Sequence, residues 1–313
     1  MKYYMGIDGG GTKTAFVLSN EEGKVIGEHV CEGISYRQIG MEGVVRVCSD
    51  AVTLLCEKHQ VERADLSICI GLPNYGESKG NDQKIEALLK QALSPAKTAV
   101  VNDCEVGLAG SFGIEPGINI VAGTGSIAFG RNASREVARS GGWSEYFSDE
   151  GSCRWMGIKT MEYFSKESDG RLPRAALYTL VKEHFQVEED FDVIDIFEAE
   201  YLPYRSKIAS LQKVLFAAAK AGDASAISLY DQAAKELTGI ILAVHGKLWK
   251  KDEVCRISYS GGLFKTGDMI LDPLKEKLSQ YHMELVQPKY KEPVYGAVEL
   301  AAELNGDSVV LKM

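Results

Sequence analysis

The chain has 313 residues, of which 45% are apolar and 25% charged, and it carries a formal net charge of −9 with a pI of about 5.2. This length and composition are ordinary for a globular protein with two domains. The acidic balance argues against nucleic acid as the main partner, because phosphate backbones are held by clustered lysine and arginine. Any anionic ligand must therefore be held by local backbone donors or by a metal ion.

Cysteine usage and the N-terminus bear on the compartment. The seven cysteines are scattered and include no CxxC pair, which favours reduced thiols over a disulfide framework or a zinc site. The chain has no basic region followed by an apolar stretch at its start and no run of 18 apolar residues. We therefore expect a soluble, cytoplasmic protein with no membrane partner.

The first third of the chain predicts a mixed sheet. Its apolar patterning predicts strands at 3–7, 14–19 and 25–30, a helix at 41–59, a strand at 66–71, a helix at 82–93 and a strand at 98–101. Three antiparallel strands that lead into alternating helices and strands form such a sheet, with helices covering it.

The rest of the chain begins in the same way. Strands are expected at 118–121, 127–130 and 137–139, a helix-rich region at 151–250 broken at "ESDGRLP", a strand at 254–259, a helix at 268–281, a strand at 283–286 and a last helix from Pro293. A strand, a turn of small residues with a hydroxyl and a return strand thus occur near residues 8 and 123. This repetition indicates a degenerate internal duplication.

The stretch "GIDGGGTKT" is the first candidate site. It is not a Walker A loop, because Thr12 separates Gly11 from Lys13. A glycine-rich hairpin here lets the N–H groups of Gly10 and Gly11 point into one concavity that suits phosphate, with the Thr12 hydroxyl and the Lys13 charge beside it. Asp8 adds a carboxylate suited to hydrated Mg²⁺. The alternative is a plain hairpin with a solvated lysine.

The stretch "VAGTGSIAFG" is the second candidate. It matches the dinucleotide fingerprint GxGxxA after a strand, but that fingerprint must open a helix. The residues after Gly125 alternate as in a strand, so we reject a nicotinamide cofactor here. Gly123, Thr124 and Gly125 are instead predicted to form a second phosphate-facing turn.

The stretch "VNDCEVGLAG" joins the two halves. Asn102 followed by Glu105 resembles a capping box, which makes Asn102 an N-cap and puts Asp103 at the first helical position. Alone, Asp103 would only complement the helix dipole. Beside two phosphate turns it becomes a candidate general base for phosphoryl transfer.

Two further stretches complete the candidate site. "GGWSEYFSDEGS" combines the aromatic Trp143 with Asp149 and Glu150, which suits a polyol ligand, although Asp149 could simply cap a helix that starts at Gly151. In "YSGGLF", Gly261 and Gly262 would let a flat base lie against the backbone, or form a plain turn after a strand.

In their order and spacing over nearly the whole chain, these motifs resemble the sugar kinase/Hsp70/actin superfamily. "DGGGTKT" and "AGTGS" resemble its two phosphate motifs, "SGGLF" its adenosine motif, and "NDCEVGLAG" and "EPVYGAVELA" its two connecting helices. "GGW…DEGS" resembles the BadF/BadG/BcrA/BcrD-type ATPase family and its N-acetylglucosamine kinase-like branch.

The resemblance implies an α/β fold of two actin-like (ribonuclease H-like) domains, each with a mixed five-stranded sheet flanked by helices. ATP and Mg²⁺ would lie in the cleft, and the last helix would pack on the first domain. The domains are expected at 1–115 with 290–313, and at 116–289 with a helical insertion. The resemblance further implies that Asp103 activates a sugar 6-hydroxyl and that Thr124 and Asp149 contact the sugar.

Two departures from the branch bear on the sugar. Ser35 in "GISYRQIG" stands where such kinases have a sugar-binding asparagine, and Ser144 and Ser148 replace glycines. Together with Ser35, the neighbouring Tyr36 and Arg37 could serve a different amino sugar or an acidic one, since arginine pairs bidentately with carboxylates.

Three functions remain open at this point. The preferred one is an ATP-dependent kinase of N-acetylglucosamine or glucosamine. The second is an activator ATPase, which would need cysteines placed to hold an iron–sulfur cluster across a dimer axis. The third is a non-catalytic sensor of sugars or cell-wall fragments. The sequence does not decide between a monomer and a homodimer.

Overall fold

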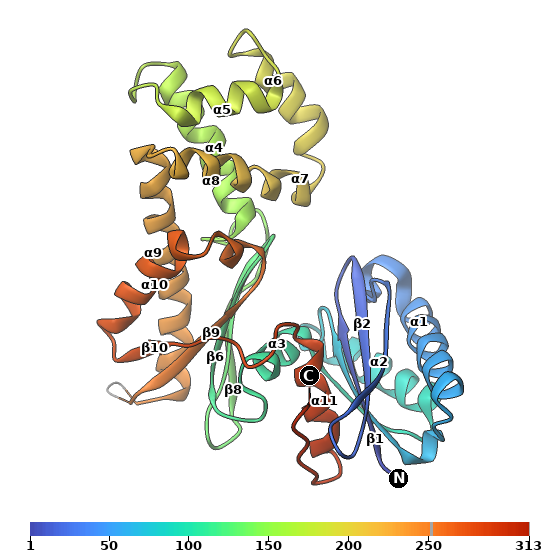
Figure 1. The fold of residues 1–313 in the computed structure, drawn as a ribbon. Coiled ribbons are helices and arrows are strands. Elements are labelled where there is room, and N and C mark those ends of the chain that lie inside the picture. The colour runs from blue at the N-terminus through green and yellow to red at the C-terminus, as the bar shows by residue number, and fades with distance from the viewer. Residues whose placement is uncertain (251–252, 313) are drawn as a thin grey trace. The chain divides into compact units, whose positions relative to one another are not determined.

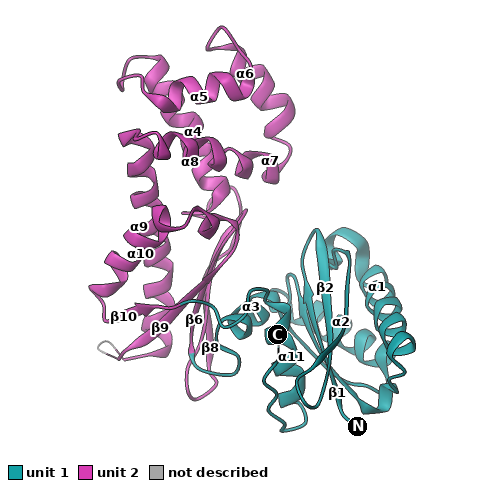
Figure 2. Ribbon diagram, viewed as in Figure 1, with its two compact units in different colours: residues 1–116, 287–313 teal, residues 117–286 magenta. Residues whose placement is uncertain are grey.

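The structure is a computed structural model that describes residues 1–250 and 253–312. The chain forms two compact units, one made of residues 1–116 and 287–313 and the other of residues 117–286 (Figures 1 and 2). The expected domain boundaries fall at 115/116 and 289/290, and Met313, at the end of the expected first domain, lies outside the described residues.

The first unit contains a five-stranded mixed sheet in the order β3-β2-β1-β4-β5. Its strands are β1 (Tyr3–Gly9), β2 (Lys13–Asn20), β3 (Val25–Glu32), β4 (Leu66–Leu72) and β5 (Lys97–Asn102). β1, β2 and β3 are antiparallel, whereas β1, β4 and β5 run parallel. The carboxyl ends of β1, β4 and β5 therefore meet at one edge, where sites of α/β proteins are built.

Helices cover both faces of this sheet. They are α1 (Tyr36–His59), α2 (Lys79–Leu93), α3 (Asp103–Phe112) and α11 (Val294–Glu303), with a short 3₁₀ turn at Arg63–Asp65. The side chains of β1 alternate between two apolar clusters: Met5 and Ile7 pack with α1 and α2, and Tyr4 packs with α3 and α11. This alternation buries the central strand on both faces.

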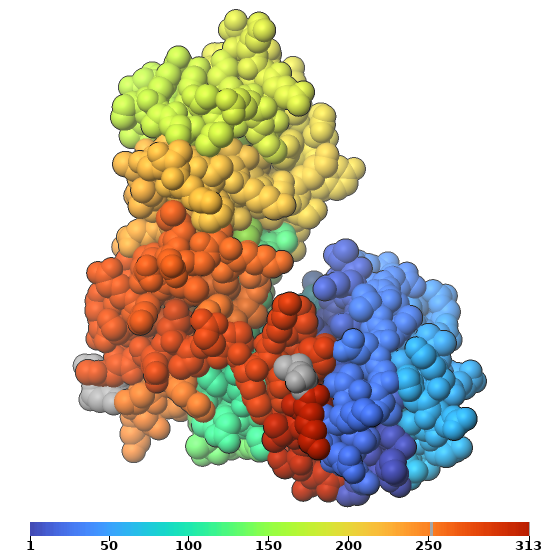
Figure 3. All heavy atoms as spheres, in the orientation of Figure 1, coloured from blue at the N-terminus to red at the C-terminus, as the bar shows by residue number. Residues whose placement is uncertain are grey.

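The last helix packs on the first unit, as expected. A Cβ on Gly296 of α11 would lie 2.1 Å from the backbone nitrogen of Gly110 in α3, so the two helix backbones are in contact there. In the space-filling view the C-terminal segment (red) lies against the N-terminal strands (blue) (Figure 3). Both connecting-helix motifs thus share one packing interface.

The second unit repeats the sheet of the first. Its order is β10-β9-β6-β7-β8, with β6 antiparallel to β7, β7 antiparallel to β8, and β6, β9 and β10 parallel. The strands are β6 (Gly117–Ala122), β7 (Ser126–Arg131), β8 (Val137–Gly141), β9 (Cys255–Ser260) and β10 (Met283–Leu285). The common topology of the two sheets confirms the predicted duplication.

A helical insertion separates β8 from β9 in this unit. It comprises α4 (Cys153–Ser168), α5 (Ala176–Phe185), α6 (Asp192–Ile196), a π-turn at Phe197–Tyr201, α7 (Arg205–Ser210), α8 (Gln212–Lys220) and α9 (Ala224–Leu248); a 3₁₀ turn at Gly262–Thr266 and α10 (Asp268–Ser279) follow β9. The predicted break at "ESDGRLP" falls between α4 and α5. The insertion, β6 and α10 share one apolar core.

Some element bounds differ from the sequence expectation. Helix α1 begins at Tyr36 and not at residue 41, because a first turn precedes a kink at Gly40, whose φ is 74°. Among the described residues, no helix is both long and apolar enough to cross a bilayer.

Candidate functional site

The first glycine stretch forms the turn between β1 and β2. The N–H of Gly10 donates to the Lys13 carbonyl at 2.9 Å, and the N–H of Ile34 donates to the Gly10 carbonyl at 3.0 Å. These bonds close a tight hairpin on which the chain after β3 also packs. Gly11, Thr12 and Lys13 are exposed, so their polar groups face solvent from the end of the hairpin.

The glycines of this turn do not all serve the fold. A Cβ on Gly9 would lie 2.5 Å from the Gly71 carbonyl oxygen, and one on Gly10 would lie 2.9 Å from the Lys13 carbonyl oxygen, so internal packing requires both glycines. Gly11 has no such constraint, because its Cβ would meet only the Gln38 side chain at 3.6 Å and its φ is not positive. A glycine there leaves room for the close approach of an external group.

Asp103 stands at the carboxyl end of β5 as predicted. The side chain of Asn102 accepts the N–H of Cys104 at 2.9 Å, which confirms Asn102 as the N-cap of α3, and Asp103 is the first residue of that helix. The Asp103 carboxylate also accepts the Cys104 N–H, at 2.9 Å. This position combines a helix N-terminus with the edge of a parallel sheet.

Two carboxylates of this edge have raised pKa values. Burial raises the pKa of Asp103 to about 6; the Cys104 N–H opposes this shift and Glu77 adds to it. Burial likewise raises the pKa of Asp8 to about 7, with Asp103 and Glu292 raising it further and Lys13 lowering it. Carboxylates of raised pKa at the end of a sheet are suited to proton transfer or to binding a cation.

The segment at the start of α1 faces a loop that the sequence analysis did not single out. The hydroxyl of Ser35 donates to the side-chain oxygen of Asn74 at 3.2 Å, and the hydroxyl of Tyr36 donates to the Asn74 carbonyl at 3.3 Å. The guanidinium of Arg37 pairs with Glu77 at 2.5 Å. Asn74 and Glu77 follow β4 directly, and the end of a parallel strand was the signal that could have indicated them.

In the second unit, the second glycine stretch is the turn of the β6–β7 hairpin. Residues Ser126–Arg131 form β7, so the fingerprint-like stretch opens a strand and the rejection of the dinucleotide motif is confirmed. Gly123 lies close to Gly262 after β9: a Cβ on Gly123 would be 3.9 Å from the Gly262 backbone nitrogen. The phosphate-type turn and the predicted adenosine turn therefore adjoin, with Thr124 and Gly261 exposed beside them.

Asp149 is a buried carboxylate that packs on this turn. Its side chain is 6% exposed and accepts the N–H of Ser126 at 3.2 Å. A Cβ on Gly125 would lie 2.7 Å from the Asp149 Oδ1 atom, so only glycine leaves room for the carboxylate. The alternative that Asp149 caps α4 is wrong, because Ser152 caps it by accepting the N–H of Trp155 and the helix begins at Cys153, not Gly151.

A cluster of charges from the insertion holds Asp149. Arg205 at the start of α7 donates from Nη2 to Asp149 at 2.9 Å and pairs through Nε with Glu145 at 3.0 Å. Arg154 of α4 pairs with the same Glu145 carboxylate at 3.3 Å. Sequence analysis did not single out Arg205, because 56 residues separate it from Asp149.

The other sugar-site candidates of this unit lie on the same loop. Trp143 is exposed, and so are Tyr146 and Phe147, so the loop presents three aromatic rings to solvent. Glu150 accepts the Ser126 hydroxyl through its backbone carbonyl at 2.7 Å. The loop is thus anchored at Ser126 while its aromatic side chains remain available for stacking.

The predicted site residues fall into two groups, one in each unit. The first unit holds Asp8, Gly10, Gly11, Thr12, Lys13, Ser35, Tyr36, Arg37 and Asp103, and the second holds Gly123, Thr124, Gly125, Trp143, Asp149, Glu150, Gly261 and Gly262.

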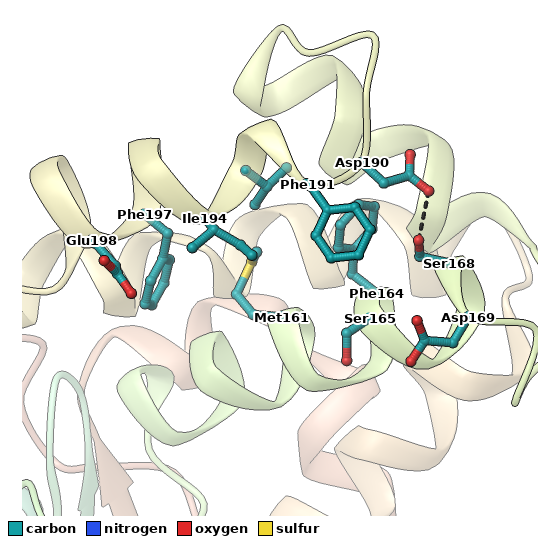
Figure 4. A pocket seen from close by; sticks show the side chains of 11 residues that line it. Met161, Phe164, Ser165, Ser168, Asp169, Asp190, Phe191, Ile194, Phe197 and Glu198 are labelled. Carbon is teal, nitrogen blue, oxygen red and sulfur yellow. Dashed lines mark hydrogen bonds between the residues drawn. The ribbon is translucent and has the colours of Figure 1, made fainter.

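An apolar pocket in the insertion contains none of these residues. Figure 4 shows Phe191 and Ile194 lying over Met161 and Phe164 of α4, with a hydrogen bond between Ser168 and Asp190 at one end. The pocket lies between α4 and α6, in the part of the insertion that bears no predicted site residue.

The chain is similar in sequence to a family of ATPases and to sugar kinases. A sequence model of the BadF/BadG/BcrA/BcrD ATPase family matches residues 5–301. The chain is 30% identical to the N-acetylmuramic acid/N-acetylglucosamine kinase of Clostridium acetobutylicum, covering 96% of this chain and 98% of that protein. It is 29% identical to the glucosamine kinase GspK of Vibrio cholerae, covering 79% and 82%.

A solved structure supports the fold. The crystal structure of a Chromobacterium violaceum protein assigned as an N-acetylglucosamine kinase is 23% identical, covers 96% of this chain and 99% of its own, and superposes with a TM-score of 0.75. At this identity the likeness shows the fold, which is the expected one of two actin-like α/β units.

Proposed function

We propose that this chain, which belongs to the BadF/BadG/BcrA/BcrD ATPase family, is an ATP-dependent kinase that phosphorylates the 6-hydroxyl of N-acetylglucosamine or glucosamine. The activities named for its relatives from C. acetobutylicum and V. cholerae support this substrate class. The observation that carries the proposal is the position of Asp103, a carboxylate of raised pKa at the start of α3 and at the end of a parallel strand.

Asp103 acts as the general base. At pH 7 and above a carboxyl with a pKa of about 6 is mostly ionised, and its basicity exceeds that of an ordinary aspartate. It accepts the proton of the sugar hydroxyl as that oxygen forms a bond to the γ-phosphorus of ATP. The bond between the γ-phosphorus and the β,γ-bridging oxygen breaks, and ADP leaves with that oxygen.

The glycine turns hold the nucleotide. In the first unit Gly11, Thr12 and Lys13 offer exposed donors for phosphate oxygens, and in the second unit Gly123 and Thr124 do the same. Gly262, next to Gly123, leaves an open backbone surface for the adenosine. Each unit thus offers one glycine turn whose donors suit phosphate oxygens.

The residues around Asp8 fit a hydrated magnesium ion. Asp8 is a desolvated carboxylate beside the glycine turn. Asp103 and Glu292 add negative charge near it, and the positive charge of Lys13 offsets part of that charge. Mg²⁺ takes few protein ligands and keeps several waters, so one carboxylate suffices to hold it through water. Bound there with ATP, such an ion would neutralise part of the phosphate charge.

The sugar contacts come from both groups of residues. Asp149, fixed by Arg205 and the Ser126 N–H, accepts hydrogen bonds from sugar hydroxyls, with Glu150 and Thr124 beside it. Trp143 offers a ring face to the pyranose. In the first unit, Ser35, Tyr36 and Arg37, which contact the loop after β4, are the remaining candidates for sugar contacts. A kinase that draws on cellular ATP acts in the cytoplasm.

A coupled ADP-release assay tests the function. The purified protein with ATP and Mg²⁺ is offered glucosamine, N-acetylglucosamine, N-acetylmannosamine and glucose, and the product is identified by NMR. We expect turnover of the glucosamine-derived sugars and phosphate on O6. If no sugar raises ADP release above the background, while nucleotide still binds, the kinase proposal is wrong and a sensor is the better description.

A further inference from the structure

The loop between β4 and α2, residues 73–78, connects the two sugar-facing segments of the first unit. Asn74 contacts Ser35 and Tyr36 at the start of α1, and the carbonyl of Tyr75 accepts the side-chain amide of Asn102 at 2.6 Å. Asn102 directly precedes Asp103. The loop therefore lies beside both the α1 start and the base, although none of its residues was among the expected site residues.

Asn74 has a left-handed backbone conformation, and its side-chain amide contacts Ser35 and Glu77. Its φ is 67°, in the left-handed region that asparagine tolerates better than most residues. The side-chain oxygen accepts the Ser35 hydroxyl, and the side-chain nitrogen approaches Glu77 at 3.4 Å, which is a long hydrogen bond. A carboxamide has two donors and two lone pairs, so Asn74 retains hydrogen-bonding capacity for a sugar hydroxyl.

Glu77 pairs with Arg37, the cation at the start of α1. Its carboxylate lies 2.5 Å from the Arg37 guanidinium, and its side chain is 27% exposed while that of Arg37 is 60% exposed. A substrate carboxylate that sought Arg37 would have to displace Glu77 and would then lie near an uncompensated negative charge. Such like-charge contacts are a means of rejecting a ligand.

The side chains near Asp103, the proposed base, include further acidic groups. Glu77 is close enough to Asp103 to raise its pKa, and Asp103 in turn raises the pKa of Asp8. With Arg37 paired to Glu77, the carboxylates of Asp103 and Asp8 leave an excess of acidic groups near the base, which Lys13 only partly offsets. A neutral or cationic ligand is favoured there over an anionic one.

We infer that the β4–α2 loop sets the sugar specificity of this half of the site: Asn74 hydrogen-bonds the sugar beside Ser35, and Glu77 occupies Arg37 so that neutral or cationic amino sugars are accepted and amino sugars bearing a carboxylate are rejected. The inference rests on the proposed function. It distinguishes this chain in substrate class from its C. acetobutylicum relative, whose name includes N-acetylmuramic acid.

The charge test uses three sugars and two readouts. Turnover and calorimetric binding in the presence of ADP and Mg²⁺ are measured for glucosamine, N-acetylglucosamine and N-acetylmuramic acid. For the wild type we expect the acidic sugar to be at least about tenfold poorer than N-acetylglucosamine in kcat/KM and in affinity. Glu77→Gln frees the guanidinium, so this ratio should shift toward the acidic sugar by about tenfold, and adding Arg37→Met should remove the gain.

Matched controls separate charge from folding. Glu162→Gln removes another carboxylate that forms surface ion pairs, in this case with two lysines of the insertion. It should leave the ratio of kcat/KM between the acidic and the neutral sugar unchanged. Asn74→Gly keeps the positive φ accessible while removing the amide, and it should raise KM for N-acetylglucosamine without changing ADP affinity. Asn74→Asp should restore little of this affinity and should disfavour the acidic sugar further.

The outcomes distinguish the two levels of the proposal. Binding of neutral sugars without turnover refutes the kinase function and leaves this specificity to be judged from affinities. The inference is overturned if Glu77→Gln leaves the ratio between the acidic and the neutral sugar as it is in the wild type. It is also overturned if the wild type accepts the acidic sugar as readily as the neutral one. Absence of binding by all three sugars overturns both.

Discussion

The two units share one sheet topology, but the aspartates beside their glycine hairpins lie in different surroundings. Each unit places a glycine hairpin next to an aspartate: Asp8 and then Asp103 in the first, Asp149 in the second. Asp103 has a raised pKa, because burial outweighs the Cys104 N–H that favours its charged form. Asp149 is more deeply buried but paired with Arg205 and with the Ser126 N–H.

This difference separates two chemical tasks. A carboxylate whose charge is poorly compensated gains from taking a proton, which is what a general base must do. A carboxylate paired with a guanidinium keeps its orientation, which suits a hydrogen-bond acceptor for sugar hydroxyls. We therefore expect the same residue type to serve proton transfer in one unit and positioning in the other.

The largest expected effect tests the first task. Asp103→Asn removes the proton acceptor while preserving its size and the bond from the Cys104 N–H, so kcat should fall by about 10² to 10⁴. ADP affinity, measured by calorimetry, should change little. Asp231→Asn, at an exposed ion pair with Lys277 in the second unit, serves as control. In the wild type, kcat/KM should fall as the pH drops below about 6, where Asp103 takes up a proton.

Those results also have a contrary outcome. A variant at position 103 that keeps wild-type turnover would show that Asp103 is not the base. Asp103 and Asp149 would then both have only a positioning role, and the two units would not differ in this respect.

The next effect tests what the two hairpins have in common. A Cβ at Gly11 or at Gly123 has room within its own unit, so alanine there should leave the melting temperature within a few degrees. If both turns approach phosphate closely, each substitution should weaken ATP binding by about tenfold or more. Gly239→Ala in α9, an equally open position, should leave ATP affinity unchanged and stabilise the helix slightly.

If alanine weakens ATP binding at one of the two turns only, the comparison becomes sharper. The phosphate contacts would then belong to a single unit. Unchanged ATP affinity in both variants would contradict the phosphate role of the glycines.

A smaller effect tests the second task. Arg205→Met leaves the Asp149 carboxylate buried without its cation, which should raise KM for the sugar by about tenfold and leave kcat less affected. Because the Arg205 side chain is 49% exposed, water can replace part of the ion pair. Combining Arg205→Met with Asp149→Asn should give a non-additive change in unfolding free energy, measured by urea titration. Additive changes would mean that Arg205 does not hold Asp149.

The local parts of this architecture could be predicted from the sequence, and the non-local parts could not. Strand periodicity, the glycine turns and the Asn102 cap depend on neighbouring residues, so the mixed sheet covered by helices and the placement of Asp103 followed from them. The actin-like fold of two domains followed from the family resemblance. "DEGS" offered two possible caps, and Ser152 rather than Asp149 took the role because Asp149 is turned toward Ser126 and Arg205. Arg205 and Asn74 reach their partners only through tertiary packing, which no local spacing encodes.

The smallest effect compares the two carboxylates through stability. The pKa of Asp103 in the folded chain is about 6, above the ordinary 3.8, so the folded state binds this proton more tightly than the unfolded state does. The stability that the group contributes is present below pH 4 and is lost as the pH rises through 6. Asp103→Asn avoids this loss and should exceed the wild type in unfolding free energy by about 1 to 2 kcal/mol at pH 7.5, with the gap closing toward pH 4.

Asp149→Asn should change stability with the opposite sign at pH 7.5, because it removes the charge that pairs with Arg205. Urea titrations of both variants at pH 4.5 and 7.5 measure the two signs together. If Asp103→Asn is destabilised at neutral pH as Asp149→Asn is, then the Asp103 carboxylate is well compensated in the folded chain. The contrast between a proton acceptor in one unit and a fixed acceptor in the other would then lose its physical basis.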